Sequence, residues 1–380
     1  MKKNKNRFLL GFFLGMLAMA VVVGGVGTGL YFANKNTSGK TISEKTSQKL
    51  DYINKLIDAK FLNKVNESDL EDGIYKGLLE GLNDPYSVYY TAEEYRKMME
   101  QTSGTYSGIG ALVSQNAETG IITVVKAFAD APAAKAGVKN GDIIYKVKGK
   151  EVTGVDINNV VTEMKGEKGT TVDITVYRES EKKYIDFTIT RDQVNEPTVE
   201  YKMLDKKKKI GYIQISQFEE VTYDQFTKAL DDLKKQGMKA VIFDVRSNPG
   251  GLYETVCKML DEILPEGNLV STKDKYGNEE KQTSDSKCLD MPMVVLQNKD
   301  SASASEIFAG AIQDFNAGKI VGTQSFGKGI VQTILPLSDG SAVKLTVQDY
   351  YTPSGKNIHG KGITPDVEAE LEENATSDTQ

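Results

Sequence analysis

The chain has 380 residues, of which 39% are hydrophobic and 26% charged, a composition typical of a folded globular protein with two or three domains. Its net charge of −6, without basic stretches interleaved with aromatics, gives no reason to expect a nucleic-acid partner. Two cysteines and one histidine are too few for a disulfide framework or a zinc site, so we expect no metal and no cofactor. Cys257 and Cys288 are predicted to be small buried residues, with a disulfide between them as the alternative.

The N-terminus is predicted to be a membrane anchor. Several basic residues precede Phe8 to Ala33, which carries no charge and is long enough to cross a bilayer of roughly 30 Å. Basic residues before the span favour a cytoplasmic N-terminus, so the rest of the chain is exported. A cleaved signal peptide is the alternative, but its apolar region is usually about 7–15 residues long and ends in a small-residue site. We therefore expect residues 1–36 to form a single-pass anchor with its linker in the cell membrane.

Residues 37–104 are predicted to be a helical region. Apolar residues recur there at helical spacing, and the stripe from Leu70 to Leu82 ends at Asn83-Asp-Pro-Tyr86, a sequence that breaks helices. The stripes are interpreted as surfaces that pack onto the next domain.

Short strands and glycines replace the helical pattern in residues 105–192. Ser107-Gly-Ile-Gly-Ala-Leu-Val-Ser114 resembles the carboxylate-binding loop of a PDZ domain, and Ala131-Pro-Ala-Ala-Lys-Ala-Gly-Val138 supports the resemblance. In such a domain, successive backbone N–H groups bind a terminal carboxylate while the peptide adds as a strand to a sheet edge. Val155 to Met164 is the predicted helix on the other side of the groove. The candidate peptide-binding residues are Gly108, Ile109, Gly110, Ala111, Leu112 and Lys165.

Residues 193–371 alternate predicted strands with predicted helices, which indicates an α/β layer structure. Ile210 to Ile215 and Ala240 to Val245 are predicted strands on either side of a helix. Leu337 to Ala342 is a predicted hairpin turn. Residues 372–380 are polar and acidic and are predicted to be disordered. The expected fold class is therefore α/β multidomain: a membrane helix, a small helical segment, a β-rich PDZ domain with helices, and an α/β core.

A serine-rich helix start and a glycine-flanked lysine are the candidate catalytic elements. Asp300-Ser-Ala-Ser-Ala-Ser-Glu-Ile307 precedes Phe326-Gly-Lys-Gly-Ile-Val-Gln332 in a chain whose lone histidine, His359, lies in a predicted loop. A hydroxyl nucleophile needs a base, and without a suitable histidine a lysine is the better candidate. Ser303 and Lys328 form the most economical pair. Ser301 and Ser305 are competing nucleophiles, and Ser303 is also a fair helix cap through Glu306.

Lys328 can act as a base only if it is neutral near pH 7. The unperturbed pKa of lysine is about 10.4, and burial among apolar groups lowers it by up to roughly 3–5 units. The alternative is an ordinary surface lysine in a glycine turn. If residues 328–332 form a strand, Gln332 lies on the same face as Lys328.

Taken together, these motifs resemble those of the C-terminal processing (tail-specific) peptidases, which use a serine–lysine dyad. Further matches are Asn83-Asp-Pro-Tyr-Ser-Val-Tyr-Tyr90, Asp244-Val-Arg-Ser-Asn-Pro-Gly-Gly-Leu252 and Gly362-Ile-Thr-Pro-Asp366. The resemblance selects Ser303 as nucleophile and Lys328 as base, and it implies that Gln332 orients the lysine amine. The implied oxyanion donors are the N–H of Ala304 and that of Gly250 or Gly251.

The resemblance also implies a contact between two copies through the helical region, making a homodimer. A basic residue after the PDZ groove helix, usually arginine, couples the PDZ domain to the active site in some members. Lys165 stands there in this chain, so a bidentate fork is lost while the charge is kept. Asp244 and Arg246 are interpreted as a structural pair beside the glycine turn.

The sequence therefore predicts a membrane-anchored, extracytoplasmic serine endopeptidase that captures unstructured protein C-termini through its PDZ domain. One alternative is a non-catalytic PDZ scaffold, which the presence of Ser303, Lys328 and Gln332 argues against. The other is a Ser–Lys hydrolase acting on a non-protein substrate, for which a groove that binds peptide C-termini has no obvious purpose.

Overall fold

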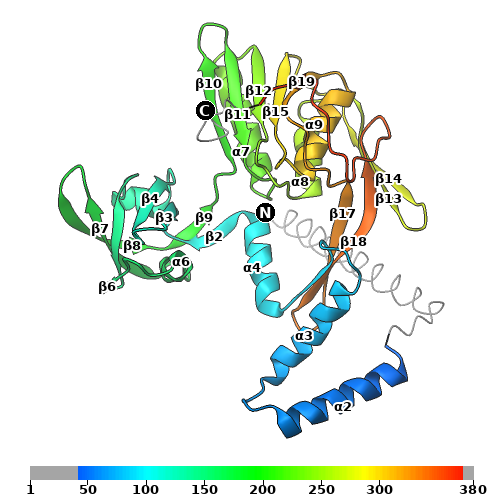
Figure 1. Cartoon of the computed structure of the whole chain (residues 1–380). Coiled ribbons are helices and arrows are strands. Elements are labelled where there is room, and N and C mark those ends of the chain that lie inside the picture. Colours follow the sequence, from blue (N-terminus) through cyan, green and yellow to red (C-terminus); the bar gives the residue numbers. More distant parts are fainter. Residues whose placement is uncertain (1–41, 371–380) are drawn as a thin grey trace, which may run out of the picture. The chain divides into compact units, whose positions relative to one another are not determined.

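The computed structural model describes residues 42–370 (Figure 1). The chain divides into two compact units, residues 1–70 and 71–380; α2 (Glu44–Lys60) lies in the first and α3 (Glu67–Glu80) spans the division. The predicted membrane anchor in residues 1–36 and the predicted disordered tail at 372–380 lie outside the described residues. Within the described range, no helix is both long and apolar enough to cross a bilayer.

In the second unit, β1 (Val88–Tyr90) is followed by α4 (Ala92–Ser103). Thr91 caps α4: its hydroxyl accepts from the N–H of Glu94 (3.2 Å), and the Glu94 carboxylate accepts from the N–H of Thr91 (2.9 Å). Gly104 ends the helix with φ of 66°, a left-handed conformation that favours glycine. The chain therefore turns sharply at Gly104 on its way to β2 (Thr105–Gly108).

The segment that resembles a PDZ domain forms a sheet of strand order β3-β4-β5-β7-β8, with β6 paired to β5 (Figure 1). In β7 buried and exposed residues alternate as a half-buried strand requires, and Val172, Ile174 and Val176 point into the core. β2 pairs antiparallel with β9 (Asp192–Asn195), so the chain enters and leaves this domain side by side. The elements are β3 (Ala111–Gln115), β4 (Ile122–Ala127), α5 (Pro132–Ala136), β5 (Ile143–Val147), β6 (Lys150–Glu151), α6 (Ile157–Met164), β7 (Thr171–Arg178) and β8 (Lys183–Thr190).

A six-stranded sheet of order β10-β11-β12-β15-β16-β19 forms the centre of the C-terminal region (Figure 1). β10 and β11 are antiparallel, and every other neighbouring pair is parallel. Phe226, Phe243 and Phe308 bring α7, β12 and α9 together in the core. The elements are β10 (Val199–Asp205), β11 (Ile210–Ile215), α7 (Thr222–Lys235), β12 (Ala240–Asp244), α8 (Tyr253–Asp261), β15 (Met293–Gln297), α9 (Ala304–Asp314), β16 (Gly318–Gly322) and β19 (Val367–Glu368).

The carboxyl ends of the parallel strands β12 and β15 lead into two neighbouring turns. The turn after β12 contains Gly250 and Gly251, and the turn after β15 contains Ser303. Because parallel strands end at the same edge of a sheet, these turns from distant parts of the sequence meet there.

A second sheet has the order β1-β18-β13-β14, with β17 also paired to β18. β17 and β18 form the hairpin predicted around residues 337–342, so that prediction is confirmed. β1 pairs with β18 and brings the Asn83-Asp-Pro-Tyr86 segment, which lies far away in sequence, to the same hairpin. The remaining elements are β13 (Gly267–Asp274), β14 (Glu279–Ser284), β17 (Ile330–Pro336) and β18 (Ala342–Tyr351).

The prediction that both cysteines are buried is wrong for Cys288. Cys257 is buried, as expected, but Cys288 is exposed, and both are free thiols. Cys257 lies on the buried face of α8, whereas Cys288 follows β14 in a surface loop. The predicted strands at 210–215 and 240–245 are confirmed as β11 and β12, and β12 ends one residue earlier, at Asp244.

Candidate active site

Ser303 is the residue at the N-terminal cap of α9 and has a strained backbone. Its φ of 56° and ψ of −114° lie outside the regions that non-glycine residues ordinarily adopt. Such a conformation costs on the order of 1–3 kcal/mol and tends to occur at functional sites. The Ser303 carbonyl accepts a hydrogen bond from the Tyr350 hydroxyl (3.2 Å), which helps to hold the turn.

The structure separates the three candidate serines. Ser301 is buried and donates from Oγ to the carbonyl of Val245 (2.7 Å). Ser305 is also buried and donates from Oγ to the carbonyl of Asn248 (2.9 Å). Ser303 is the partly exposed member, and it lines a cavity of about 700 Å³. Ser301 and Ser305 therefore brace the turn, whereas Ser303 faces the space that a ligand can enter.

Glu306 connects the serine turn to the lysine loop. Its carboxylate is fully buried and accepts hydrogen bonds from the backbone N–H of Ser303 (2.9 Å) and that of Lys328 (2.8 Å). It also accepts from the N–H of Gly327 (2.7 Å) and the hydroxyl of Ser325 (2.6 Å). One carboxylate therefore fixes the backbone at Ser303 and at Lys328. From the sequence, Glu306 is predicted only to cap the helix.

Asn248 and Gly250 hold the glycine turn against the serine turn. The Asn248 carbonyl accepts from the N–H of Ala302 (3.0 Å), and its side-chain oxygen accepts from the N–H of Gly250 (2.8 Å). A Cβ on Gly250 would lie 2.7 Å from the carbonyl oxygen of Ala302 and 2.8 Å from Cβ of Ser303. Any side chain at position 250 would therefore push the two turns apart.

The N–H groups of Gly250 and Gly251, the two predicted alternatives for an oxyanion donor, differ in their surroundings. The N–H of Gly250 is engaged by Asn248, as described above. Phe218 forms a parallel bridge to Gly251, in which Phe218 N–H donates to the carbonyl of Gly250 and Leu252 N–H to the carbonyl of Phe218. In this parallel bridge Phe218 makes both hydrogen bonds, through its own N–H and carbonyl. The N–H of Gly251 takes part in neither and points away from Phe218.

Lys328 is half-buried and lines the same cavity as Ser303. Burial lowers the pKa of the Lys328 ammonium, and the positive charge of Lys344 lowers this pKa further. Asp84 and Glu306 raise the pKa but do not outweigh burial. The Lys328 Nζ atom lies 4.5 Å from the centre of the Tyr86 ring, so the segment preceding β1 covers the amine. This aromatic cover is a feature that the local sequence around Lys328 does not reveal.

Gln332 lines the same cavity as Lys328, although the two residues do not share a strand. β17 begins only at Ile330, so Lys328 lies in the loop before it. The pairing register shifts between Val331 and Gln332, but the extra residue, Val347, lies in the partner strand β18. Alternation along β17 is therefore undisturbed, and Ile330, Gln332 and Ile334 all line the cavity. The Gln332 amide donates to the Thr346 hydroxyl (3.3 Å).

All six predicted catalytic and oxyanion-donor residues line the cavity, and His359 does not. The six are Ser303, Ala304, Gly250, Gly251, Lys328 and Gln332. His359 is exposed.

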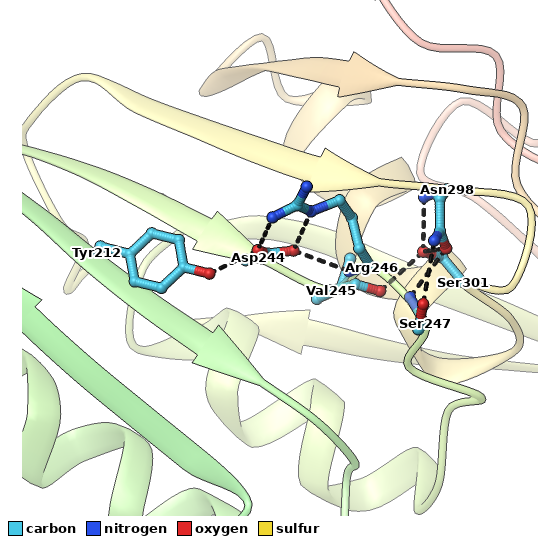
Figure 2. Close-up of polar contacts among 7 residues, drawn as sticks. All are labelled: Tyr212, Asp244, Val245, Arg246, Ser247, Asn298 and Ser301. Atoms are coloured by element: carbon cyan, nitrogen blue, oxygen red, sulfur yellow. Dashed lines mark hydrogen bonds and ion pairs between the residues drawn. The ribbon is translucent and has the colours of Figure 1, made fainter. Parts of the chain in front are cut away.

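Asp244 and Arg246 form the ion pair that the sequence suggested (Figure 2). Arg246 donates to Asp244 through Nε (2.9 Å) and a terminal guanidinium nitrogen (2.6 Å). The Tyr212 hydroxyl donates to the same carboxylate (2.6 Å), as Figure 2 shows. Because Asp244 ends β12, this network braces the strand end from which the glycine turn departs.

In the PDZ domain, the predicted loop at 108–112 covers the end of β2, the connection at Ile109 and Gly110, and the start of β3. The carbonyls of Ile109 and Gly110 accept backbone hydrogen bonds from Ala133 (2.7 Å) and Phe128 (3.0 Å), which fix the loop. Lys165 follows α6, and its Nζ lies 3.4 Å from a carboxylate oxygen of Glu100 on α4. Lys165 therefore connects the groove helix to α4.

Comparisons with known proteins agree with this architecture. Residues 209–369 match the model of Peptidase family S41, residues 107–189 that of a PDZ domain, and residues 28–94 that of the activating protease CtpB N-terminal domain. A probable CtpA-like serine protease of Staphylococcus epidermidis is 36% identical over 93% of this chain and 71% of its own length. A protein of the same description from Staphylococcus aureus is 36% identical over 93% and 72%. The solved structure of a putative S41 protease from Bacteroides fragilis shares the fold, with a TM-score of 0.55 at 15% identity over 82% of this chain and 85% of that one.

Replacing Glu306 by glutamine should destabilise the fold. An amide has one acceptor oxygen in place of two, so buried donors lose their partner, at about 1–3 kcal/mol for each unsatisfied group. We expect a lower free energy of unfolding in urea titrations and faster hydrogen exchange at the amides of Gly327 and Lys328. The control is Glu220→Gln on the surface, which should change stability by less than about 0.5 kcal/mol. Unchanged exchange at both amides would show that Glu306 does not hold the loop.

Proposed function

Since the chain belongs to peptidase family S41, the C-terminal processing peptidases, and is a serine protease, we propose that Ser303 is its nucleophile and Lys328 its general base. The observation that carries this proposal is the cavity shared by a partly exposed serine with a strained backbone and a lysine of lowered pKa. A neutral lysine amine can accept the serine proton, and a strained turn at a helix start presents the hydroxyl to the substrate.

The proposed reaction proceeds in two stages. Ser303 Oγ attacks the carbonyl carbon of the peptide bond while its proton passes to Lys328 Nζ. The protonated lysine then gives this proton to the departing amine, leaving an ester on Ser303. A water molecule, deprotonated by Lys328, attacks the ester, and its collapse releases the new C-terminus and restores the serine hydroxyl.

The tetrahedral intermediate carries a negatively charged oxygen that needs hydrogen-bond donors. We assign this role to the backbone N–H groups of Ala304 and Gly251. Ala304 is the first residue of α9, where backbone N–H groups have no partner within the helix and the helix dipole favours negative charge. Gly251 is preferred to Gly250 because Asn248 already engages the Gly250 N–H. In this proposal Gly250 contributes through the close approach of the two turns.

The proposed role of Gln332 is to orient the Lys328 amine. Its position on the cavity wall supports this role. Its side-chain amide donates to the Thr346 hydroxyl and not to the Lys328 amine. To reach the amine, the Gln332 amide has to leave the Thr346 hydroxyl.

The PDZ domain indicates that the chain binds peptides. We propose that the free carboxylate of a protein C-terminus binds the backbone N–H groups of Gly108 to Leu112, while the peptide pairs with β3 beside α6. Through its ion pair with Glu100, Lys165 would couple peptide binding in the groove to α4. Two residues of α4, Gln101 and Thr102, line the catalytic cavity. We further propose that residues 1–36 anchor the enzyme to the cell membrane, with the catalytic region on the extracytoplasmic side, and that two copies associate through the helical region.

Replacing either member of the dyad should abolish proteolysis. Ser303→Ala and Lys328→Met should each lower kcat by at least about 10⁴-fold on a protein with an unstructured C-terminal tail, and the double variant should lose little more. Circular dichroism and mass spectrometry of the products would show that folding persists while cleavage stops. His359→Ala, as a matched control outside the cavity, should retain activity. Substantial cleavage by Ser303→Ala would rule out the mechanism.

The pH dependence should follow the ionisation of Lys328. Only the neutral amine accepts the serine proton, so kcat/KM should rise with pH through the lowered pKa of Lys328. Stability gives an independent measure, because the unfolded lysine keeps its proton to about pH 10.4 while the folded lysine loses it earlier. The wild type should therefore gain stability relative to Lys328→Met as pH rises between these two values. A rate independent of pH from about 5 to 9, with chemistry limiting, would contradict this assignment.

Amidation of a peptide's C-terminus should weaken its binding to the PDZ domain. It removes the charge that the loop of backbone N–H groups is proposed to bind, so we expect the affinity to fall about tenfold or more in calorimetry. Lys165→Ala separates binding from coupling: the free peptide should still bind, while its ability to stimulate cleavage should fall. Equal binding and equal cleavage of free and amidated peptides would show that the domain does not recognise C-termini.

A further inference from the structure

A buried carboxyl group without a hydrogen-bond partner lies in the catalytic cavity. Glu219 is only 6% exposed, and among residues 42–370 no donor lies within hydrogen-bond reach of its Oε2 atom. Glu219 lines the same cavity as Ser303 and Lys328. The preceding residue, Phe218, forms the bridge to Gly251, the proposed oxyanion donor. The backbone of Glu219 is therefore directly attached to the residue that holds this glycine turn.

The backbone of Glu219 is held firmly in place. Its N–H donates to the Thr222 hydroxyl (2.9 Å), and its carbonyl accepts from the Thr255 hydroxyl (3.2 Å). On the other side, a Cβ added to Gly104 would lie 2.4 Å from Glu219 Oε2, so the glycine leaves just enough space for the carboxyl group. The carboxyl group is therefore positioned by its surroundings and does not sample the solvent as a surface side chain would.

Three acidic residues line the cavity, and none of them takes part in an ion pair within residues 42–370. They are Glu196, Glu219 and Glu254. The two cavity lysines, Lys328 and Lys344, contact the Tyr86 and Tyr90 rings. Burial, with a further contribution from Glu196, raises the pKa of Glu219 to about 7. A buried carboxylate without a donor is unfavourable, and a ligand that supplies a positive charge removes this penalty.

We propose that Glu219, assisted by Glu196, forms a subsite of the catalytic cavity that binds a basic side chain, lysine or arginine, of the peptide substrate. The inference rests on the proposed function, because it assigns a specificity determinant to the same cavity. Glu219 follows Phe218, which bridges to Gly251, and it lines the same cavity as Ser303, so the substrate residue that it selects would lie near the bond that is cut. The cationic head would donate a hydrogen bond to the Glu219 carboxylate from the cavity side, while the more exposed Glu196 strengthens the attraction for positive charge.

The test moves one lysine along an otherwise uncharged peptide that carries a fluorophore and a quencher. Each lysine peptide is compared with its norleucine counterpart, which has a similar length but no charge. At one position, wild-type kcat/KM for lysine should exceed that for norleucine by about tenfold or more, the size expected of a charge-assisted hydrogen bond. Glu219→Gln should reduce this ratio to near one. The control is Glu220→Gln, which removes the same charge at the adjacent exposed residue outside the cavity and should keep the ratio.

The pH dependence of this ratio provides a second measurement that needs no variant. The substrate lysine stays charged, whereas Glu219 gains its negative charge as pH rises through about 7, so the lysine-to-norleucine ratio should increase with pH. The other charged groups that line the cavity, Glu196, Glu254, Lys328 and Lys344, act on both peptides, and the proton transfer by Lys328 cancels in the ratio.

The outcomes separate this inference from the proposed function. Cleavage of the uncharged parent peptide by the wild type, and not by Ser303→Ala, supports the proposed function by itself. If that peptide is cleaved but lysine is favoured at no position, or if Glu219→Gln keeps the preference, the subsite is refuted and the serine–lysine mechanism stands. If the wild type cleaves none of the peptides or of the proteins with unstructured tails, both proposals fail.

Discussion

The arrangement of the active site depends on one buried carboxylate, that of Glu306. It accepts hydrogen bonds from the cap of α9 at Ser303 and from the loop that carries Lys328. These two segments are distant in sequence and need a common acceptor to stay together. Because three of its four donors are backbone N–H groups, the carboxylate fixes the main chain and leaves the Ser303 and Lys328 side chains free of it.

The sheet supplies the second constraint. β12 and β15 are parallel neighbours, so the turns that follow them meet at one edge, and Asn248 and Gly250 hold the two turns in contact. The Asp244–Arg246 pair, with the Tyr212 hydroxyl, braces the end of β12 (Figure 2). Strain at Ser303 can persist because all of these contacts determine the turn together.

Burial acts on the two titratable groups of the cavity in opposite directions. It lowers the pKa of Lys328 and raises that of Glu219, since a low-dielectric surrounding disfavours the charged form of either group. For Lys328 the neutral form is the one that the proposed chemistry needs. For Glu219 burial disfavours the anion, and in the proposed subsite a substrate cation removes this penalty by pairing with the carboxylate. In the two proposals, one cavity serves both catalysis and selection of the substrate.

The sequence by itself determined the strand and helix pattern of the C-terminal region and the candidates Ser303 and Lys328, because hydrophobic periodicity and short motifs are local properties. It could not reveal the four-donor role of Glu306, the aromatic cover of Lys328 or the second sheet, since all three depend on pairing between segments far apart in the chain. Alternation alone could not relate Gln332 to Lys328, because Lys328 lies in the loop before β17 and only the tertiary structure brings both residues to one cavity. The choice of Gly251 over Gly250, and the unpartnered carboxyl of Glu219, likewise appeared only once hydrogen bonds and burial were assigned in three dimensions.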